Sequence, residues 1–260
     1  MNPRRMLVIA KNVFAEALRD RVLYSILFFG LLLVGSWQIL PEVAAATEDK
    51  MFLDVGLGAM TVLSTLVAVF VGTGLISKEI EKRTVYILVA KPISYGELIL
   101  GKHLGLSATL AVLVAAMMVL YLGICALSKT AYPPLAALAI AGGFLVIKLS
   151  LITAVAILFG VLTRPLLATL LTFGVYLMGN LSQDMVRLNQ LVNNPSFSRM
   201  TDGIYLIFPD LSRLDLKNMA VYGMAALPDR LTLLLNAGYG LVYTIGLLAI
   251  AIAIFSRREF

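Results

Sequence analysis

Charged side chains are rare in this chain, and one short stretch, KEIEKRTVYILVAKP at residues 78–92, concentrates them. Six of its residues are charged: Lys78, Glu79, Glu81, Lys82, Arg83 and Lys91. They flank an apolar centre at residues 84–90, and long apolar runs lie on both sides of the stretch. Apolar groups rimmed by charge are typical of a surface that binds another protein. A loop whose charges only fix membrane orientation would have the same composition.

A second candidate is Lys148, which lies inside an apolar run at residues 135–162. A charge at the centre of a bilayer costs roughly 2.5–3.5 kcal/mol on insertion scales, so such residues are often functional. Lys148 could face a cavity and meet an anionic substrate or headgroup. Alternatively, the run is about 42 Å long as a helix and exceeds the bilayer. Lys148 would then lie nearer one face and snorkel, or pair with a carbonyl at a dimer interface.

The other side chains exclude most catalytic and metal chemistry. The chain has one cysteine, Cys125, and one histidine, His103, so an internal disulfide and a Cys₂His₂ zinc site are impossible. We expect Cys125 to be packed in its apolar run and His103 to be an interfacial side chain. Nearly all carboxylates lie outside the apolar runs, so no catalytic residue, metal site or enzyme activity is predicted. The phosphate-binding sequence G-x-x-x-x-G-K-[ST] is missing, so this chain is not expected to bind ATP itself.

The elements that position these residues are predicted to be membrane helices. Of the 260 residues, 60% are hydrophobic and 14% charged, with a mean hydropathy of +0.93. A bilayer core of about 30 Å needs about 20 helical residues, and several apolar runs are that long. We therefore predict one all-α membrane domain over residues 1–260. Its six expected helices cover residues 22–40, 52–76, 104–127, 135–162, 165–181 and 231–255.

Basic residues set the predicted orientation. Thirteen of the 21 Lys and Arg residues fall on the side that holds both termini and residues 77–103. Seven fall on the other side, five of them in residues 182–230 beside five Asp residues, and Lys148 is the remaining one. Because the more basic side is cytoplasmic, we predict a multi-pass protein of the inner (plasma) membrane with both termini in the cytoplasm. The basic balance therefore gives no reason to expect a nucleic-acid partner.

Two polar segments complete the plan. Residues 1–21 form a predicted amphipathic helix with apolar residues such as Ile9 and Val13 on one half and Arg4, Lys11 and Arg19 on the other. It would lie in the membrane interface, either as a simple anchor or as an elbow that frames a docking surface. Residues 182–230 are too polar to cross the membrane. We expect breaks at residues 193–195 and 208–214, and a short amphipathic piece reaching about Tyr222.

The charged stretch resembles a known family. Glu79-x-Glu81-x-Arg83-Thr84, then Lys91-Pro92-Ile93-Ser94 and Ile99-Leu100-Gly101-Lys102, looks like the loop between the second and third helices of ABC-2 type permeases. These are membrane subunits of ABC exporters, including those similar to copper-enzyme-maturation permeases. The resemblance extends to the N-terminal helix, the six-helix plan and the long outer segment.

This resemblance implies a function for the loop at residues 77–103. In the family, a coupling helix in this loop docks into a groove on a cytoplasmic ATPase. The implied ATPase-coupling residues are Glu79, Glu81, Arg83, Thr84, Val85, Tyr86, Leu88 and Pro92. Residues 182–230 would form a re-entrant gating segment, with Pro209 and Asp210 as the candidate outer gate.

The expected assembly is two ATPase copies with this chain and a second permease copy, as a homodimer or a heterodimer. ATP and magnesium would bind the ATPase, and this chain would hold no cofactor. Two rival hypotheses stay open: an ATP-independent secondary transporter or channel, which would show internal repeats and more ionisable groups in its helices, and an intramembrane lipid-modifying enzyme. The substrate is not encoded in any motif we can identify.

Overall fold

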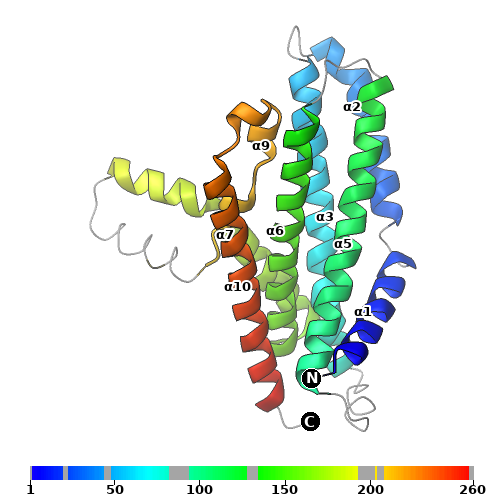
Figure 1. The fold of residues 1–260 in the computed structure, drawn as a ribbon, viewed down its shortest axis with the longest axis vertical. Coiled ribbons are helices and arrows are strands. Elements are labelled where there is room, and N and C mark those ends of the chain that lie inside the picture. The colour runs from blue at the N-terminus through cyan, green and yellow to red at the C-terminus, as the bar shows by residue number, and fades with distance from the viewer. Residues whose placement is uncertain are drawn as a thin grey trace.

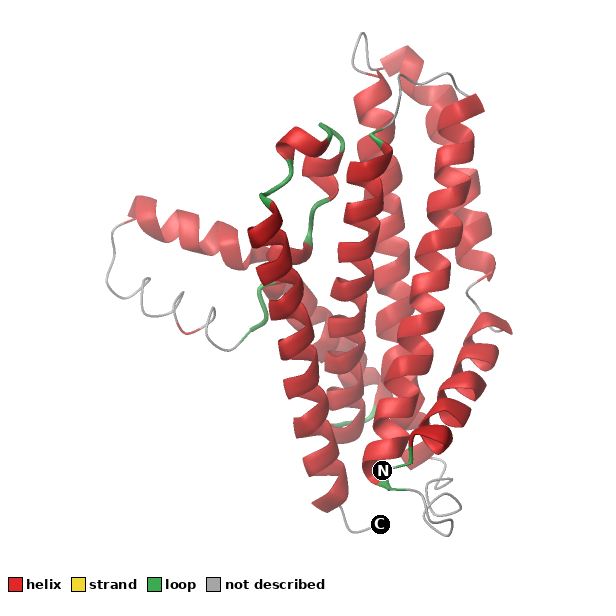
Figure 2. Cartoon of the chain, in the orientation of Figure 1, coloured by secondary structure: helices red, strands yellow, loops and turns green. Residues whose placement is uncertain are grey.

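A computed structural model describes residues 2–19, 23–43, 48–81, 94–127, 134–192, 203 and 208–257. Within these ranges the chain forms helices joined by short loops and no strands (Figure 2). The long helices run roughly alongside one another as a bundle (Figure 1). They are α1 Pro3–Ala17, α2 Leu23–Val43, α3 Glu48–Glu81, α5 Tyr95–Leu127, α6 Leu135–Leu162, α7 Pro165–Val192 and α10 Arg230–Arg257. Within residues 208–229 the chain forms the short helices η2 Leu211–Leu214, α9 Lys217–Ala220 and η3 Met224–Ala226.

Helix α6 is the centre of the bundle. It packs against α3, α5, α7 and α10, and it is buried over most of its length. A helix that is apolar all round belongs in a protein core or a membrane, and α6 carries Lys148 as its only charged residue. Whatever Lys148 contacts must therefore come from a neighbouring element.

Local sequence signals account for several helix ends. Ser94 with Glu97 three residues later predicts a capping box that starts a short helix. The capping box is confirmed: the Glu97 backbone N–H donates to Ser94 Oγ at 3.2 Å, and the Ser94 N–H donates to Glu97 Oε2 at 3.3 Å. The side chain of Asn2 accepts from the Arg4 N–H at 3.1 Å and caps α1. Pro165 begins α7, where its missing N–H costs nothing.

The helices on both sides of the charged stretch are longer than expected. The short helix predicted after Ser94 is not separate, because α5 runs unbroken from Tyr95 to Leu127. Helix α3 likewise continues to Glu81. The backbone of Glu79 and Glu81 is therefore helical. Their side chains and all of residues 82–93, with Arg83, Thr84, Val85, Tyr86, Leu88 and Pro92, lie outside the described residues.

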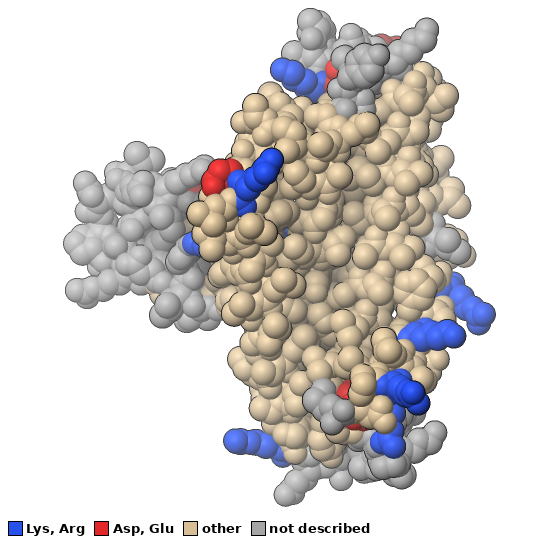
Figure 3. Space-filling model, in the orientation of Figure 1, with Lys and Arg blue, Asp and Glu red and all other residues tan. Residues whose placement is uncertain are grey.

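In the described part of the chain, five helices are long and apolar enough to cross a membrane: residues Asp49–Ile76, Tyr95–Leu127, Leu135–Leu162, Pro165–Ser182 and Arg230–Arg257. The apolar part of α2, Tyr24–Leu40, is shorter, about 26 Å by helix rise. The sixth crossing thus stays a prediction. On the face shown in Figure 3, charged side chains lie towards the two ends and on the outer segment, and a broad uncharged surface separates them.

The described part of residues 182–230, called the outer segment below, folds back onto the bundle. The last turns of α7 project sideways from it, and η2 and α9 then return (Figure 1). Helix η2 packs against α6, α7 and α10, and α9 packs against α3 and α6. The turn after α9 uses Gly223 at φ 90°, a left-handed conformation that favours glycine. The expected short piece around residues 208–222 is therefore two short helices, and it brings polar residues to the middle of α6.

Helix α1 lies directly on the start of α5. A Cβ on Gly105 would lie 2.5 Å from the Ala10 carbonyl oxygen and 2.8 Å from Val13 Cβ. A Cβ on Gly101 would lie 2.9 Å from Ile9 Cβ. The two glycines thus let the backbones approach closely, and Val13 is buried in the contact. The opposite side of α1 exposes Leu7 and Val8. The location of this helix in the membrane interface stays a prediction.

This contact predicts that Gly105→Ala destabilises the protein by about 1–3 kcal/mol, the usual cost of overpacking, because the Ala10 backbone cannot move aside. Gly123→Ala is the matched control, because Gly123 lies on the same helix and a Cβ there meets nothing within 4 Å. Cys125, the chain's single cysteine, is buried. Its labelling by a thiol-reactive fluorophore during heating in detergent would report unfolding. Equal unfolding temperatures for the two variants would contradict the close contact.

Candidate functional site

Lys148 is held by side chains from two other elements. Its side chain is 1% exposed. Nζ donates to Asn180 Oδ1 on α7 at 2.7 Å and to Asp215 Oδ2 at 3.0 Å. It also lies 5.5 Å from the centre of the Tyr176 ring, within the range of a cation–π contact. Of the alternatives for Lys148, snorkelling to a membrane face is therefore wrong: Lys148 points inward and forms an ion pair.

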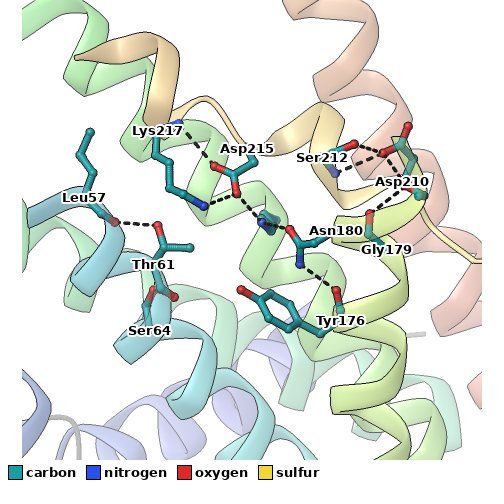
Figure 4. A network of polar contacts seen from close by, with 12 residues as sticks. Leu57, Thr61, Ser64, Tyr176, Gly179, Asn180, Asp210, Ser212, Asp215 and Lys217 are labelled. Atoms are coloured by element: carbon teal, nitrogen blue, oxygen red, sulfur yellow. Dashed lines mark hydrogen bonds and ion pairs between the residues drawn. The ribbon is translucent and has the colours of Figure 1, made fainter. Parts of the chain in front are cut away.

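Asp215 belongs to the outer segment, in the link between η2 and α9, and it binds a second lysine. Lys217 Nζ donates to the same oxygen, Asp215 Oδ2, at 2.8 Å. Figure 4 shows Asp215 between Lys217 and Asn180. Burial raises the pKa of Asp215, but Lys148 and Lys217 outweigh it and hold this pKa below its usual value. Asp215 is therefore an anion in this site at neutral pH.

A crevice opens beside this ion pair. Lys148, Asp215 and Lys217 form its polar end. The other lining residues are mainly apolar and come from α3, α6 and the outer segment: Leu57, Met60, Thr61, Ala141, Gly142, Leu145, Leu214 and Leu216. In this conformation the crevice has room for about one water molecule. It therefore holds no substrate-sized cavity as it stands.

Asp210 anchors the same segment a few residues earlier. It is 2% exposed, and its carboxylate accepts from Ser182 Oγ at 3.1 Å, the Ser212 N–H at 3.2 Å and Arg213 Nε at 3.0 Å. Its own N–H donates to the Tyr239 hydroxyl on α10 at 2.8 Å. Burial raises the pKa of Asp210, but the hydrogen bonds from Ser212, Arg213 and Ser182 outweigh it and lower this pKa.

Pro209 adds a backbone contact to this anchor. A Cβ on Gly179 would lie 2.6 Å from the Pro209 carbonyl oxygen, so only glycine fits this point on α7. Pro209 and Asp210, the two residues predicted as an outer gate, therefore attach the outer segment to α7 and α10. An attachment of this kind is compatible with a gate, and the gating role itself stays a proposal.

Together these contacts join the outer segment to the middle of the bundle. Ile147 lies opposite Gly240, ten residues after the start of α10 at Arg230, so the Lys148 site lies about 15 Å along that helix from its first residue by helix rise. An unpaired charge at such a depth is costly, and a partner carboxylate removes most of that cost. The arrangement is therefore an ionic link between the outer segment and α6.

The opposite end of the bundle has its own buried polar contacts. The Asn2 backbone N–H donates to Glu97 Oε1 at 2.5 Å, which ties the start of α1 to the start of α5. Lys102 Nζ donates to the Leu75 carbonyl on α3. His103, expected at the membrane interface, is instead 5% exposed, with Nε2 3.0 Å from the Ser150 carbonyl oxygen on α6. These contacts join α1, α3, α5 and α6 at the end of the bundle where α5 begins.

The sequence identified Lys148 but missed its partners. Asn180, Asp215 and Lys217 carried no motif, and five Asp residues in 182–230 were equally available. The one usable signal was that a buried lysine requires a carboxylate. Among the described residues no three His, Cys, Asp or Glu side chains could hold a metal ion together.

The comparison with protein families agrees with the resemblance seen in the sequence. A family model described as ABC-2 family transporter protein matches residues 7–260. No curated protein matches the chain. The family match runs from α1 through the charged loop and the outer segment to the last residue, so the ABC-2 prediction is confirmed. The closer likeness to copper-enzyme-maturation permeases stays a prediction.

The ion pair predicts an ordered series of stabilities. Removing one partner from a buried ion pair usually destabilises a protein by about 3–5 kcal/mol, because the other charge stays buried. Asp215→Asn should cost less, about 2–3 kcal/mol, because Asn keeps an oxygen that can accept from Lys148. Lys148→Met should cost less, because Asp215 keeps Lys217. The double variant should be more stable than Asp215→Asn alone, since it leaves no unpaired charge that is fully buried: Lys217 also loses Asp215, but its side chain is 33% exposed. Cys125 labelling on heating measures all three, and strictly additive costs would contradict a direct interaction.

Proposed function

The chain belongs to the ABC-2 family of transporter proteins, and on that premise we propose that it is the permease subunit of an ATP-driven exporter. It forms the substrate path, and a separate cytoplasmic ATPase drives it. The observation that carries this proposal is the family match over residues 7–260. The five helices able to cross a membrane support a multi-pass permease.

The helix geometry supports coupling over a distance. Helix α3 has 34 residues, about 50 Å by helix rise. Its last turn leads into the charged stretch at residues 78–92, and its earlier turns place Leu57, Met60 and Thr61 beside the Lys148 crevice. In this proposal an ATPase that pushes on residues 79–92 moves α3 and α5 as stiff levers. Because α3 packs along α6, the motion reaches the outer ionic link and changes its stability.

The orientation follows from the basic residues. Both termini and the charged loop would face the cytoplasm, and residues 182–230 would face outward. The start of α1 and the end of α10 lie at the same end of the bundle (Figure 1), and basic side chains gather around that end on the face in Figure 3. A second permease copy, identical or different, would complete the path between two ATPase subunits.

Native mass spectrometry of the complex, purified in mild detergent from its host, tests the proposal. We expect two copies of this 28.1 kDa chain, or one copy with a second permease, together with two copies of an ATPase that contains a phosphate-binding loop. Recovery of the chain without an ATPase in several mild detergents would instead favour the secondary transporter or channel.

The coupling residues give a second prediction. Glu79→Ala and Glu81→Ala should leave assembly intact but reduce stimulation of the partner's ATP hydrolysis severalfold, because each removes a charged contact at the docking surface. Glu42→Ala, an exposed carboxylate on α2 at the predicted outer end, is the control and should behave as wild type. Hydrolysis is measured on the reconstituted complex, and full stimulation in the Glu79/Glu81 double variant would exclude these residues from coupling.

A further inference from the structure

The Lys148 site has one more positive charge than negative. Two ammonium groups, on Lys148 and Lys217, donate to a single oxygen of Asp215. Among the described residues no other carboxylate forms an ion pair with either lysine. The group of three therefore carries a net charge of +1. One further anion would neutralise it, and the partly buried setting makes that interaction stronger than it would be in water.

The three charges lie on two different parts of the fold, the long helices and the outer segment. Lys148 and its other partner, Asn180, lie on the long helices α6 and α7. Asp215 and Lys217 lie together on the outer segment, two residues apart. If the outer segment moves away, Asp215 keeps Lys217 as its partner and stays neutralised. Lys148 then keeps the amide of Asn180 and the Tyr176 ring but has no anion, and its buried ammonium requires a new one.

The surroundings of Lys148 indicate what that anion is attached to. The crevice beside the ammonium is lined by the apolar side chains of Leu57, Met60 and Leu145. Thr61 turns its hydroxyl to the Leu57 carbonyl at 2.8 Å, so it offers its methyl group to the crevice. A cationic point next to an apolar slot matches an amphiphile with an anionic headgroup and a hydrocarbon chain.

We propose that Lys148 and Asn180 bind the anionic headgroup of an amphiphilic substrate, and that Asp215 occupies this position until the substrate displaces it. This proposal rests on the proposed transport function and names the class of substrate. The headgroup is a carboxylate or a phosphate, and the apolar chain lies along α3 and α6. Lys217 makes the exchange possible because it keeps the displaced Asp215 neutralised. Cationic amphiphiles are excluded, since they would meet the uncompensated ammonium.

The test measures binding of defined probes to the purified protein, with whatever subunits copurify, in nanodiscs of zwitterionic lipid. The probes are dodecyl phosphate, dodecyltrimethylammonium and inorganic phosphate. The variants are Asp215→Asn, Lys148→Met with Asp215→Asn, and Asp54→Asn. The last is the control, because it removes an exposed carboxylate from α3 by the same substitution.

We expect Asp215→Asn to bind dodecyl phosphate about tenfold more tightly than wild type, since the competing carboxylate is gone; tenfold corresponds to about 1.4 kcal/mol. The double variant should lose this binding, and Asp54→Asn should equal wild type. Dodecyl phosphate should bind more tightly than inorganic phosphate, because only the former fills the apolar slot. Tighter binding of inorganic phosphate than of dodecyl phosphate would overturn the proposal of an amphiphilic substrate and indicate a site for a free anion.

A second measurement covers the possibility that Asp215→Asn is poorly folded. Dodecyl phosphate should raise the unfolding temperature of Asp215→Asn, as measured by Cys125 labelling, because it restores an anion next to Lys148. It should not raise that of the double variant. Equal effects of dodecyl phosphate and dodecyltrimethylammonium, or equal effects on all variants, would overturn the proposal. Neither measurement uses ATP. A purified protein without an ATPase would therefore count against the proposed function, whereas the binding of dodecyl phosphate at Lys148 would still be decided by these measurements.

Discussion

The structure depends on one electrostatic constraint: an ammonium group in the middle of an apolar helix bundle must be neutralised by protein. Lys148 lies on the central helix, with no other charge on α6 to pair with it. Its partner comes from the outer segment, which has to descend to the depth of Lys148 to deliver Asp215. The Asp210 contacts, the close approach of Pro209 to Gly179 and the left-handed turn at Gly223 then hold that segment in place.

The two ends of the bundle are connected through the same long helices. At one end α3 and α6 border the Lys148 site, and at the other end α3 and α5 lead into the charged stretch at residues 78–92. Buried contacts such as Asn2 to Glu97 and Lys102 to the Leu75 carbonyl make the inner end a single unit with α1. A bundle of stiff helices with a polar attachment at each end can transmit a small displacement, because packed cores adopt discrete arrangements.

Much of this fold could be predicted from the sequence, and the exceptions have physical causes. Apolar runs and prolines located the long helices, and Ser94 with Glu97 located the start of α5. The continuity of α5 was missed because Glu97, Lys102 and His103 look like loop residues. Each of them is buried, and its polar group is bound by a partner on another helix. The choice of Asp215 from five similar residues depended on how far the outer segment folds inward, and no local pattern encodes that distance.

The separation of Lys148 from Asp215 along the chain has a consequence for biogenesis. The two residues are 67 positions apart, so α6 leaves the ribosome well before its counter-ion exists. At about 5–20 residues per second, synthesis of the intervening chain takes roughly 3–13 s. During that interval α6 must wait in the insertion machinery, or in a partly hydrated intermediate, with its ammonium unmatched. Maturation of this protein would therefore be completed only when the segment that carries Asp215 has been made and closes over a helix inserted earlier.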